Sequence, residues 1–449
     1  MGKYPVVPVQ VGELTGFRKT VSLPDPCFGQ LKTSSKIKLK VGQWDTVVEI
    51  IRNSSDKRIL LSEDLLLKSG LFNGTECFSK VEGNSLKLGP LIGLFTSRKH
   101  ISRLNRQDAS FRTLEILKAS QKARTVLYHF SIRNLQWNTN TINGTIFNPI
   151  SQKWEKRILP FPDVLYDRAS GRAYRKYEDH VLARNKMDEM KIPKVNAVHY
   201  FDKWDLSRHL GRYRDVKEYL PETYKYTPLH LKKMLKRNPI IYLKAAIGSM
   251  GTRIMRLESK GNKYKYSVYR KTLQTGQSFS LQRVNHKVAD FFGNDQVIMQ
   301  QGIRLIQVNK GNVDMRATVQ RNSKGKLEIN SIAVRIGKEG FPITSSRTGS
   351  NIVRLDEFME KHGNHYSDKL EDKIHQFLIR IYQRIEDIYG PFGEMGIDFG
   401  VDTSGNIYFI ESNAKPAKDS LYQSFDRKTI DRAFRNPMEY AKQLSGFQS

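Results

Sequence analysis

The sequence has few cysteines and no long apolar segment. Cys27 and Cys77 are the only two cysteines among 449 residues, and neither has another cysteine or a histidine at metal-ligand spacing. This excludes a disulfide framework and a cysteine-based zinc site. No run of about 18 apolar residues is present, and the first ten residues lack an apolar core. We therefore expect a soluble, intracellular protein without a signal peptide or transmembrane segment.

Acidic residues are also scarce. Asp and Glu number 45 against 75 Lys and Arg, which gives a formal net charge of +30. Such a charge favours polyanionic partners, which include nucleotides, nucleic acid, acidic peptides and anionic surfaces. A basic surface that only maintains solubility is the alternative. Hydrophobic residues still make up 39% of the chain, enough for several packed cores at roughly 150 residues per domain.

The pattern along the chain changes twice. Residues 1–88 contain short strand-like runs separated by Gly, Asn, Ser and Asp, and predict a small β-rich module. Residues 89–200 alternate apolar runs with a helical segment that Ser110 can cap, which is typical of an open α/β domain. Residues 201–449 mix longer helices with strands and are predicted to form the third domain.

The third region contains the strongest secondary-structure patterns. Thr227 and Pro228 open a short helix, and Ser367 is predicted to cap a long periodic helix that ends at Gly390. A last helix is predicted to start at Asn436. The predicted strands are 240–245, 297–308, 314–321, 327–335, 396–401 and 407–413.

The residues with the clearest chemistry lie in the last two of these strands. Side chains alternate along a strand, so Asp398 projects from the face opposite to its apolar neighbours. Glu411 and Asn413 are two residues apart in the next strand and share a face. Two carboxylates and one amide oxygen are therefore available within one hairpin.

The expected register brings the two carboxylates together. A four-residue loop at 403–406 would pair Asp402 with Ile407, which places Asp398 opposite Glu411. Like charges at facing positions destabilise a sheet unless a cation lies between them. Mg²⁺ fits best, because it is a hard cation that prefers oxygen ligands. An exposed hairpin with scattered acids is the structural alternative.

A second candidate segment begins with Lys244, which ends an apolar strand. It precedes a flexible loop with two glycines, Gly248 and Gly251, whose backbone N–H groups could fold over phosphates. The chain lacks both the G-x-x-x-x-G-K-[ST] and the G-x-G-x-x-G motifs. A plain strand end is the alternative interpretation of this segment.

A third candidate is the polar face of the strand 314–321. Asp314 and Arg316 share this face, and Arg335 lies near the end of the next strand. Two guanidinium groups at such positions can bind anionic groups through paired hydrogen bonds. A solvated sheet face is the alternative.

Taken in order, these segments resemble the ATP-grasp superfamily, and within it the YheC/YheD family of endospore coat-associated proteins from spore-forming bacteria. The stretches that carry the resemblance are FDKWDLSRHL, YLPET, YLKAAIGSMGTRI, VIMQQGIRL, VDMRATVQR, AVRIG and GEMGIDFGVDTSGNIYFIESNAKP. The resemblance implies an α+β fold in which two α+β lobes clamp ATP. It covers roughly residues 201–445, which an α/β pre-ATP-grasp domain and the β-rich module would precede.

The resemblance also implies the roles of individual residues. The nucleotide-binding residues would be Lys203, Lys244, Gly248, Ser249, Met250, Gly251, Gln300, Gln301, Ile303 and Lys415. The Mg²⁺ ligands would be Asp398, Glu411 and Asn413. The residues that face the transferred phosphate or the acyl substrate would be Arg316 and Arg335.

The activity that the resemblance implies is an ATP- and Mg²⁺-dependent carboxylate ligase. It would form an acyl phosphate that an amine or a thiol attacks, in the forespore or at the spore coat, with anionic spore components as further partners. The net charge of +30 and the segment 344–350, which lacks the Asn and glycine pair frequent in relatives, favour the alternative of a nucleotide-binding structural or assembly protein with little or no turnover. A further departure is Gln300, which stands where many superfamily members have Glu and would alter the nucleotide contacts.

Nucleic-acid binding is a third hypothesis. Residues 98–124 contain eight Lys and Arg against two acids. The stretch has few aromatic residues and no known nucleic-acid motif, so this hypothesis is disfavoured.

Overall fold

A computed structural model of the chain describes residues 6–31, 35–169, 177–248, 253–269, 272–341, 343–344, 349–362 and 369–448. These residues form two compact units. The first comprises the described parts of Met1–His199, Arg321–Lys326 and Asp431–Ser449, and the second those of Tyr200–Gln320 and Leu327–Ile430. None of the described helices is both long and apolar enough to cross a lipid bilayer.

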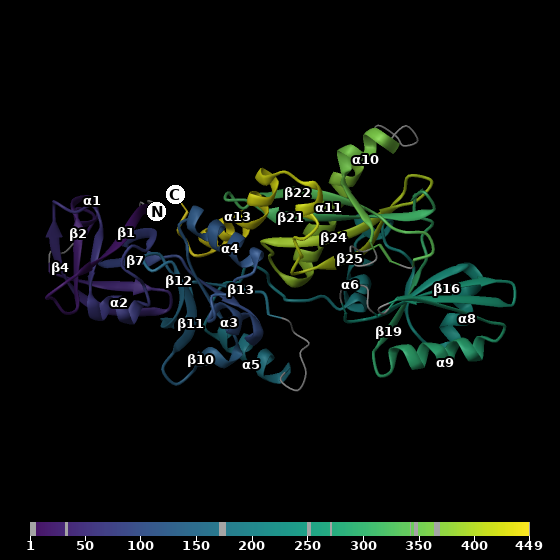
Figure 1. Cartoon of the computed structure of the whole chain (residues 1–449), viewed down its shortest axis with the longest axis horizontal. Helices are drawn as coiled ribbons and strands as arrows, with labels where there is room; N and C mark the ends of the chain where they lie inside the picture. Colours follow the sequence, from purple (N-terminus) through teal and green to yellow (C-terminus); the bar gives the residue numbers. More distant parts are fainter. Residues whose placement is uncertain are drawn as a thin grey trace. The chain divides into compact units, whose positions relative to one another are not determined.

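The first unit begins with seven strands that close into a barrel in the order β1-β5-β2-β4-β3-β7-β6 (Figure 1). Its elements are β1 (Val6–Leu14), β2 (Thr20–Pro24), α1 (Asp25–Phe28), β3 (Lys36–Val41), β4 (Trp44–Asn53), β5 (Ile59–Ser62), α2 (Glu63–Ser69), β6 (Glu76–Glu82) and β7 (Ser85–Gly89). Alternation explains the strands, since Ile37 and Leu39 of β3 are buried while Lys36 and Lys38 are exposed. The predicted β-rich content of this segment is confirmed, although the closure of its strands into a barrel was not predicted.

Both cysteines lie inside this barrel. Cys27 and Cys77 are free and buried, and burial raises the pKa of the Cys77 thiol to about 12. A thiol with so high a pKa is not reactive near neutral pH. The prediction of two ordinary thiols is confirmed.

An α/β sheet follows the barrel. Its elements are β8 (Leu91–Phe95), α3 (Arg98–Leu104), α4 (Phe111–Lys122), β9 (Val126–Phe130), η1 (Ile132–Asn134), β10 (Leu135–Gln136), β11 (Thr141–Asn148), β12 (Lys153–Pro160), β13 (Val164–Asp167) and α5 (Tyr177–Glu189). The strands β9, β8 and β13 run parallel and are fully buried, as the apolar runs predict. Ser110 caps α4 by accepting a hydrogen bond from the Thr113 N–H, which confirms that prediction.

The last helix begins earlier than the sequence predicted. α13 spans Arg427–Leu444 and contains Pro437 in its interior. Asp426 accepts a hydrogen bond from the Thr429 N–H at 2.7 Å, which satisfies a donor at the true start of the helix. The predicted start at Asn436 is wrong, because a helix can continue through a proline when packing compensates for the lost hydrogen bond.

The second unit contains two sheets. The first, which we call the β15 sheet, has the strand order β14-β19-β15-β16-β17-β18 and is antiparallel throughout. Its elements are β14 (Thr223–Lys225), α8 (Pro228–Arg237), β15 (Ile240–Ala245), β16 (Ile254–Lys260), β17 (Lys263–Tyr269), β18 (Leu273–Ser278), α9 (Leu281–Phe292) and β19 (Val297–Gln301).

One face of the β15 sheet is covered by helices. Leu231 of α8 and Val284 of α9 share a buried core with Leu243 of β15, and Figure 1 shows both helices on the same side of the sheet. Because side chains alternate along β15, Tyr242 and Lys244 lie on the opposite face. We call this second face the open face of the β15 sheet.

The other sheet, which we call the β24 sheet, has the order β23-β22-β21-β24-β25, with β20 paired to β21. Its strands are β20 (Gln307–Val308), β21 (Gly311–Arg321), β22 (Leu327–Ile336), β23 (Asn351–Arg354), β24 (Glu394–Val401) and β25 (Ile407–Asn413). The remaining helices of the unit are α6 (Lys203–Leu210), α7 (Arg214–Lys217), α10 (Leu355–His362), α11 (Leu370–Tyr389) and α12 (Leu421–Ser424).

The long helix α11 packs on the apolar face of the β24 sheet. The rings of Phe377 and Phe399 lie 5.4 Å apart between their centroids. Gly390 ends α11, as predicted. Ser367, the predicted cap, lies outside the described residues. The polar side chains of β24 therefore project from the sheet face opposite to α11.

The predicted single strand 297–308 is two strands. β19 ends at Gln301 and β20 begins at Gln307, so the chain leaves one sheet and joins the other between them. Gly302 permits the crossing, because a Cβ atom there would lie 2.8 Å from the carbonyl oxygen of Ile240. The segment 302–306 therefore connects the two sheets.

Candidate active site

A cavity of about 470 Å³ lies in the second unit, and both sheets contribute to its walls. The β15 sheet contributes Lys244 and Gln300, and the β24 sheet contributes Asp398 and Glu411. Its volume lies in the range of ordinary small-molecule sites. Its lining combines charged side chains, such as Lys244, Asp398 and Glu411, with apolar ones, such as Phe409 and Ile410.

The hairpin of β24 and β25 brings the predicted metal-binding side chains together. Asp398 pairs with Glu411, and Gly396 pairs with Asn413. The predicted pairing of the two carboxylates is confirmed. The loop that was expected to produce it is wrong, because Val401 and not Asp402 pairs with Ile407.

One extra residue in β25 explains why the two carboxylates pair although the loop differs from the expected one. A β-bulge at Ile410 shifts the register between Asp398 and Phe399. Without this bulge Glu411 would pair with Ile397 and lie on the apolar face of the hairpin. The bulge therefore places both carboxylates on the same side of the sheet.

The loop itself is closed by Asp402. Its carboxylate accepts hydrogen bonds from the backbone N–H groups of Ser404 at 2.9 Å and Asn406 at 2.8 Å. This Asx-type turn lengthens the loop by one residue on the β24 side. It is the local reason that the simple four-residue loop does not form.

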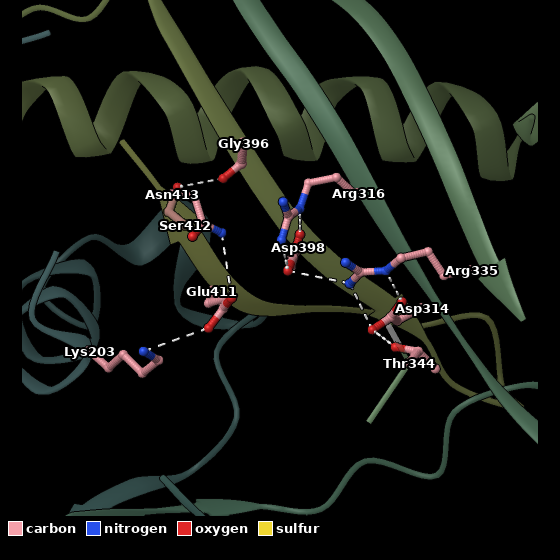
Figure 2. A network of polar contacts seen from close by, with 10 residues as sticks. All are labelled: Lys203, Asp314, Arg316, Arg335, Thr344, Gly396, Asp398, Glu411, Ser412 and Asn413. Atoms are coloured by element: carbon pink, nitrogen blue, oxygen red, sulfur yellow. Dashed lines mark hydrogen bonds and ion pairs between the residues drawn. The ribbon is translucent and has the colours of Figure 1, made fainter. Parts of the chain in front are cut away.

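Asp398 is buried and surrounded by guanidinium groups. Arg316 lies directly opposite on β21 and contacts both carboxylate oxygens, while the Nη2 atom of Arg335 lies 3.3 Å from Oδ2 (Figure 2). Burial alone would raise the pKa of Asp398, but the two guanidinium groups lower it below its usual value. The Asp398 carboxylate is therefore ionised near neutral pH.

Gly396 makes room for this contact. A Cβ atom at position 396 would lie 3.5 Å from the Cδ atom of Arg316 and 3.1 Å from the Cβ atom of Pro416. The absence of a side chain allows the stem of Arg316 and the segment after β25 to pack against the β24 backbone. This glycine thus contributes to the position of Arg316.

Arg335 is oriented by Asp314, a residue to which the sequence analysis assigned no role. Two hydrogen bonds of 2.6 and 2.9 Å join the guanidinium group to the Asp314 carboxylate. Thr344 donates a third hydrogen bond to the same carboxylate. Burial raises the pKa of Asp314 even though Arg335 opposes this effect. The i, i+2 spacing of Asp314 and Arg316 was the sequence feature that could have identified it.

Lys203 and Asn413 flank Glu411. The Nζ atom of Lys203 lies 3.8 Å from Oε2 of Glu411 and donates a 2.7 Å hydrogen bond to the carbonyl of Gly248. The Nδ2 atom of Asn413 lies 3.5 Å from Oε1 of Glu411. Lys203 occupies the first turn of α6, whose N-cap is Asp202. Figure 2 shows the contacts of Lys203 and Asn413 with Glu411 beside the Asp398 cluster.

Lys244 has an amide partner instead of a carboxylate. It is buried, and its Nζ atom donates a 2.5 Å hydrogen bond to the side-chain oxygen of Gln300. Burial lowers the pKa of Lys244 to about 8; Glu411 opposes this shift and Lys203 adds to it. A buried ammonium group without a bonded carboxylate is a site that an anion can stabilise.

The structure places the remaining predicted residues as follows. Gln301, Ile303 and Lys415 line the cavity. The backbone N–H of Gln301 already donates to the carbonyl of Glu222 at 2.8 Å. Ser249, Met250 and Gly251 lie outside the described residues, as do residues 345–348 of the substrate-side segment. The roles predicted for these residues stay predictions.

The donor set fits Mg²⁺ in its chemistry. Among the described residues no cluster of three His, Cys, Asp or Glu side chains could hold a metal, but Asp398, Glu411 and Asn413 offer two carboxylates and one amide oxygen. Mg²⁺ is commonly held by one or two carboxylates, with water and phosphate oxygens completing its octahedron. Asp398 would have to share at least one oxygen now contacted by guanidinium.

Removal of the buried ammonium group gives a pH-dependent change in stability. Because the folded-state pKa of Lys244 is below its ordinary value of 10.5, the unfolded chain binds more protons between about pH 8 and 10.5, and folding stability rises with pH in that range. Relative to Lys244→Met, the wild type is expected to gain about 2 to 3 kcal/mol between pH 7 and pH 10.5. Urea unfolding of both proteins at the two pH values measures this, and an equal difference at both would contradict it.

Comparison with known proteins agrees with this geometry. A family model described as YheC/D like ATP-grasp matches residues 191–444. The chain is 27% identical over 416 residues to the endospore coat-associated protein YheD of Bacillus subtilis (strain 168), covering 88% of this chain and 87% of that protein. It is 23% identical over 326 residues to YheC of the same organism, covering 71% and 88%.

Two solved structures are also similar. The ATP-grasp ligase PsnB complexed with a minimal precursor has a TM-score of 0.48 and 13% identity, covering 80% of this chain and 99% of that one. D-alanyl-alanine synthetase A from Vibrio cholerae O1 biovar eltor str. N16961 has a TM-score of 0.47 and 14% identity, covering 78% and 98%. The family match confirms the predicted α+β ATP-grasp fold. The chain belongs to the YheC/D-like ATP-grasp family.

Proposed function

We propose that the chain is an ATP- and Mg²⁺-dependent carboxylate ligase. It would form an acyl phosphate and transfer the acyl group to an amine or a thiol. The observation that carries this proposal is the convergence on one cavity of Lys244, two arginines and an oxygen-rich hairpin, whose Glu411 is contacted by Lys203. Phosphoryl transfer needs positioning and charge neutralisation more than a covalent protein group, and these side chains supply both.

Lys203 and Lys244 would bind the phosphates of the nucleotide. Both are close to Glu411, since Lys203 contacts its carboxylate and the buried Lys244 interacts with it electrostatically. The adenine would lie beside Gln300, Gln301 and Ile303, against apolar lining residues of the cavity such as Phe409 and Ile410. Lys415 would add positive charge at the phosphate end.

Asp398, Glu411 and Asn413 would hold Mg²⁺. When bound, the metal would neutralise charge on the phosphate oxygens. Arg316 would move from Asp398 toward the transferred phosphate, because its guanidinium group and a metal cannot both use the same carboxylate lone pairs. Arg335 would stay in place, since Asp314 holds it through two hydrogen bonds.

The reaction would proceed in two steps. A substrate carboxylate oxygen attacks the γ-phosphorus and ADP leaves with the electron pair of the broken P–O bond. The amine or thiol then attacks the acyl carbon, and inorganic phosphate leaves while the nucleophile loses its proton. Arg316 and Arg335 would stabilise the negative charge on the transferred phosphate in both steps.

The cellular setting of this activity would be endospore coat formation. The similarity to two proteins named endospore coat-associated supports this proposal. We also propose three domains for the chain, 1–88, 89–200 and 201–449. The last would carry the nucleotide site.

A second candidate is a nucleotide-binding assembly protein without turnover. Two observations favour it. Gln300 provides an amide where a carboxylate would hold Lys244 more firmly in its charged form, and Asp398 is already paired with guanidinium groups. In this case the nucleotide would act as a structural ligand.

Turnover separates the two candidates. Wild-type protein with ATP, Mg²⁺ and panels of carboxylates and amines is expected to release ADP, and Glu411→Gln is expected to lower the rate about 100-fold or more through loss of metal binding. ATP at 100 times its Kd is expected to stabilise the wild type by about 2.7 kcal/mol. Stabilisation without ADP release would favour the assembly protein, and no stabilisation would contradict both candidates.

The low pKa of Lys244 predicts how nucleotide affinity depends on pH. Phosphates favour the charged lysine, so affinity is expected to fall above about pH 8, by up to about tenfold per pH unit. Gln300→Glu places a carboxylate beside Lys244 and is expected to shift this fall to higher pH. Calorimetric titration with an ATP analogue measures both curves. Identical curves would show that Lys244 does not bind the phosphates.

The Arg316 contact predicts competition between a guanidinium group and the metal. Arg316→Gln is expected to bind Mn²⁺ alone roughly tenfold more tightly than the wild type, because a cation beside Asp398 is removed. Electron paramagnetic resonance of free Mn²⁺ measures this, with Arg354→Gln, which removes an exposed arginine paired to Asp356, as the matched control. Unchanged or weaker binding in Arg316→Gln would contradict the competition.

A further inference from the structure

In the described part of the chain, the outer strand of the β15 sheet has no strand paired on its free side. β18 ends the strand order, and only β17 pairs with it among the described residues. Its six residues, Leu273–Ser278, contain no charge and no proline. Natural edge strands are usually protected by charges, prolines, bulges or a covering element. β18 has neither charge nor proline, and its outward N–H and C=O groups can accept another strand.

The register of β16, β17 and β18 fixes which side chains accompany this edge. Lys265 pairs with Gln277 of β18, and Lys263 pairs with Lys260 of β16. Phe279 follows β18 and continues the same row, since the Nζ atom of Lys263 lies 5.9 Å from the centre of its ring. Rows of paired residues share a face of the sheet.

These rows lie on the open face. Tyr264 and Tyr266 of β17 pack against the buried core that α8 and α9 cover, so the alternating residues Lys263 and Lys265 project from the opposite side. Lys244 projects from this same side. The lysines Lys260, Lys263 and Lys265, which we call the lysine row, therefore share a face with the cavity but lie nearer to the β18 edge.

Among the residues that the structure describes, the lysine row has no anionic ion-pair partner. Lys260 and Lys263 face each other, and like charges at facing positions destabilise a sheet. Glu258 lies across from Lys265 but forms its ion pair with Arg256 at 3.0 Å. No described carboxylate forms an ion pair with any of the three lysines. The arrangement is complementary to an anionic partner.

An exposed aromatic ring ends the edge strand. Phe279 is 71% exposed, more than any other large apolar side chain among the described residues. An isolated apolar residue on the surface is ordinary, but this one continues the lysine row at the end of an edge strand. It offers an apolar contact to whatever pairs with β18.

We propose that an extended acidic polypeptide segment binds here by pairing with β18 as an additional strand. Main-chain hydrogen bonds to the edge supply affinity, and alternate side chains supply specificity. Strands are spaced about 4.8 Å apart, so β17 lies about 10 Å from the added strand, within reach of an extended lysine and glutamate together. The lysine row selects acidic side chains, and Phe279 contacts an apolar residue beside them.

The charge pattern argues against two other occupants. A second copy of the chain would bring its own lysine row and its own net charge of +30 to the edge, so the two copies would repel each other. Nucleic acid would match the lysines but has no peptide groups to pair with β18. The proposal holds whether or not the cavity turns over ATP.

Charge reversal tests the position of the partner. The probe is a short fluorescent peptide of alternating Glu and Val, measured by anisotropy with full-length protein. Lys263→Glu/Lys265→Glu is expected to weaken binding about tenfold or more. The matched control is Lys232→Glu/Lys233→Glu, which reverses two exposed lysines of α8 on the helix side of the same sheet. An equal loss of peptide affinity in both double variants would show that only the net charge of the protein matters, and would overturn the proposal.

Proline substitution tests strand pairing. Gln274→Pro and Thr275→Pro each remove one backbone N–H group of β18. Adjacent N–H groups of a strand point to opposite sides, so one of the two points outward. The variant whose circular dichroism spectrum and melting temperature match those of the wild type is used for the binding measurement. It is expected to lose peptide binding, whereas binding of a single-stranded DNA of matched charge is expected to be unaffected. Retained peptide binding, or light scattering that shows a β18-dependent dimer, would overturn the proposal. Failure of ADP release alone would leave these results unchanged, so the two proposals are separable.

Discussion

The buried carboxylate of Asp398 can exist only because cationic groups surround it. It lies in a sheet whose other face is packed against α11, and an unpaired ionised carboxylate in such a place would be strongly destabilising. Arg316 and Arg335 supply that charge here. A divalent metal ion would also compensate the negative charge of this carboxylate, so the position is suitable for metal binding. Structure and proposed chemistry therefore depend on the same electrostatic constraint.

Backbone irregularities place the groups that meet this constraint. The bulge at Ile410 puts Glu411 on the face of Asp398, and Gly396 leaves space for the stem of Arg316. The segment after Gln301 then brings the β15 sheet, with Lys244, to the same cavity. Each of these backbone features positions only one or two residues. Together they determine which charged side chains lie at the cavity.

Much of this was readable from the sequence. Strand alternation predicted β15 and β25 at their observed bounds, and the pairing of Asp398 with Glu411 is correct. The pairing was predicted correctly because two errors cancelled. The loop is one residue longer than expected, and the bulge, which was not expected, shifts the register back by one residue. Contacts between distant segments could not be predicted. The pairing of Arg316 with Asp398 and the closure of the barrel depend on strand neighbours that no local pattern encodes.

A crystal structure with Mn²⁺ and a non-hydrolysable ATP analogue would test the central claim most directly. The account predicts an anomalous peak at coordination distance from oxygens of Asp398, Glu411 and Asn413, with the γ-phosphate near Lys203 and Lys244 and with Arg316 withdrawn from Asp398. A nucleotide bound away from Lys244, or a metal peak that touches neither carboxylate while both arginines keep their contacts, would contradict it.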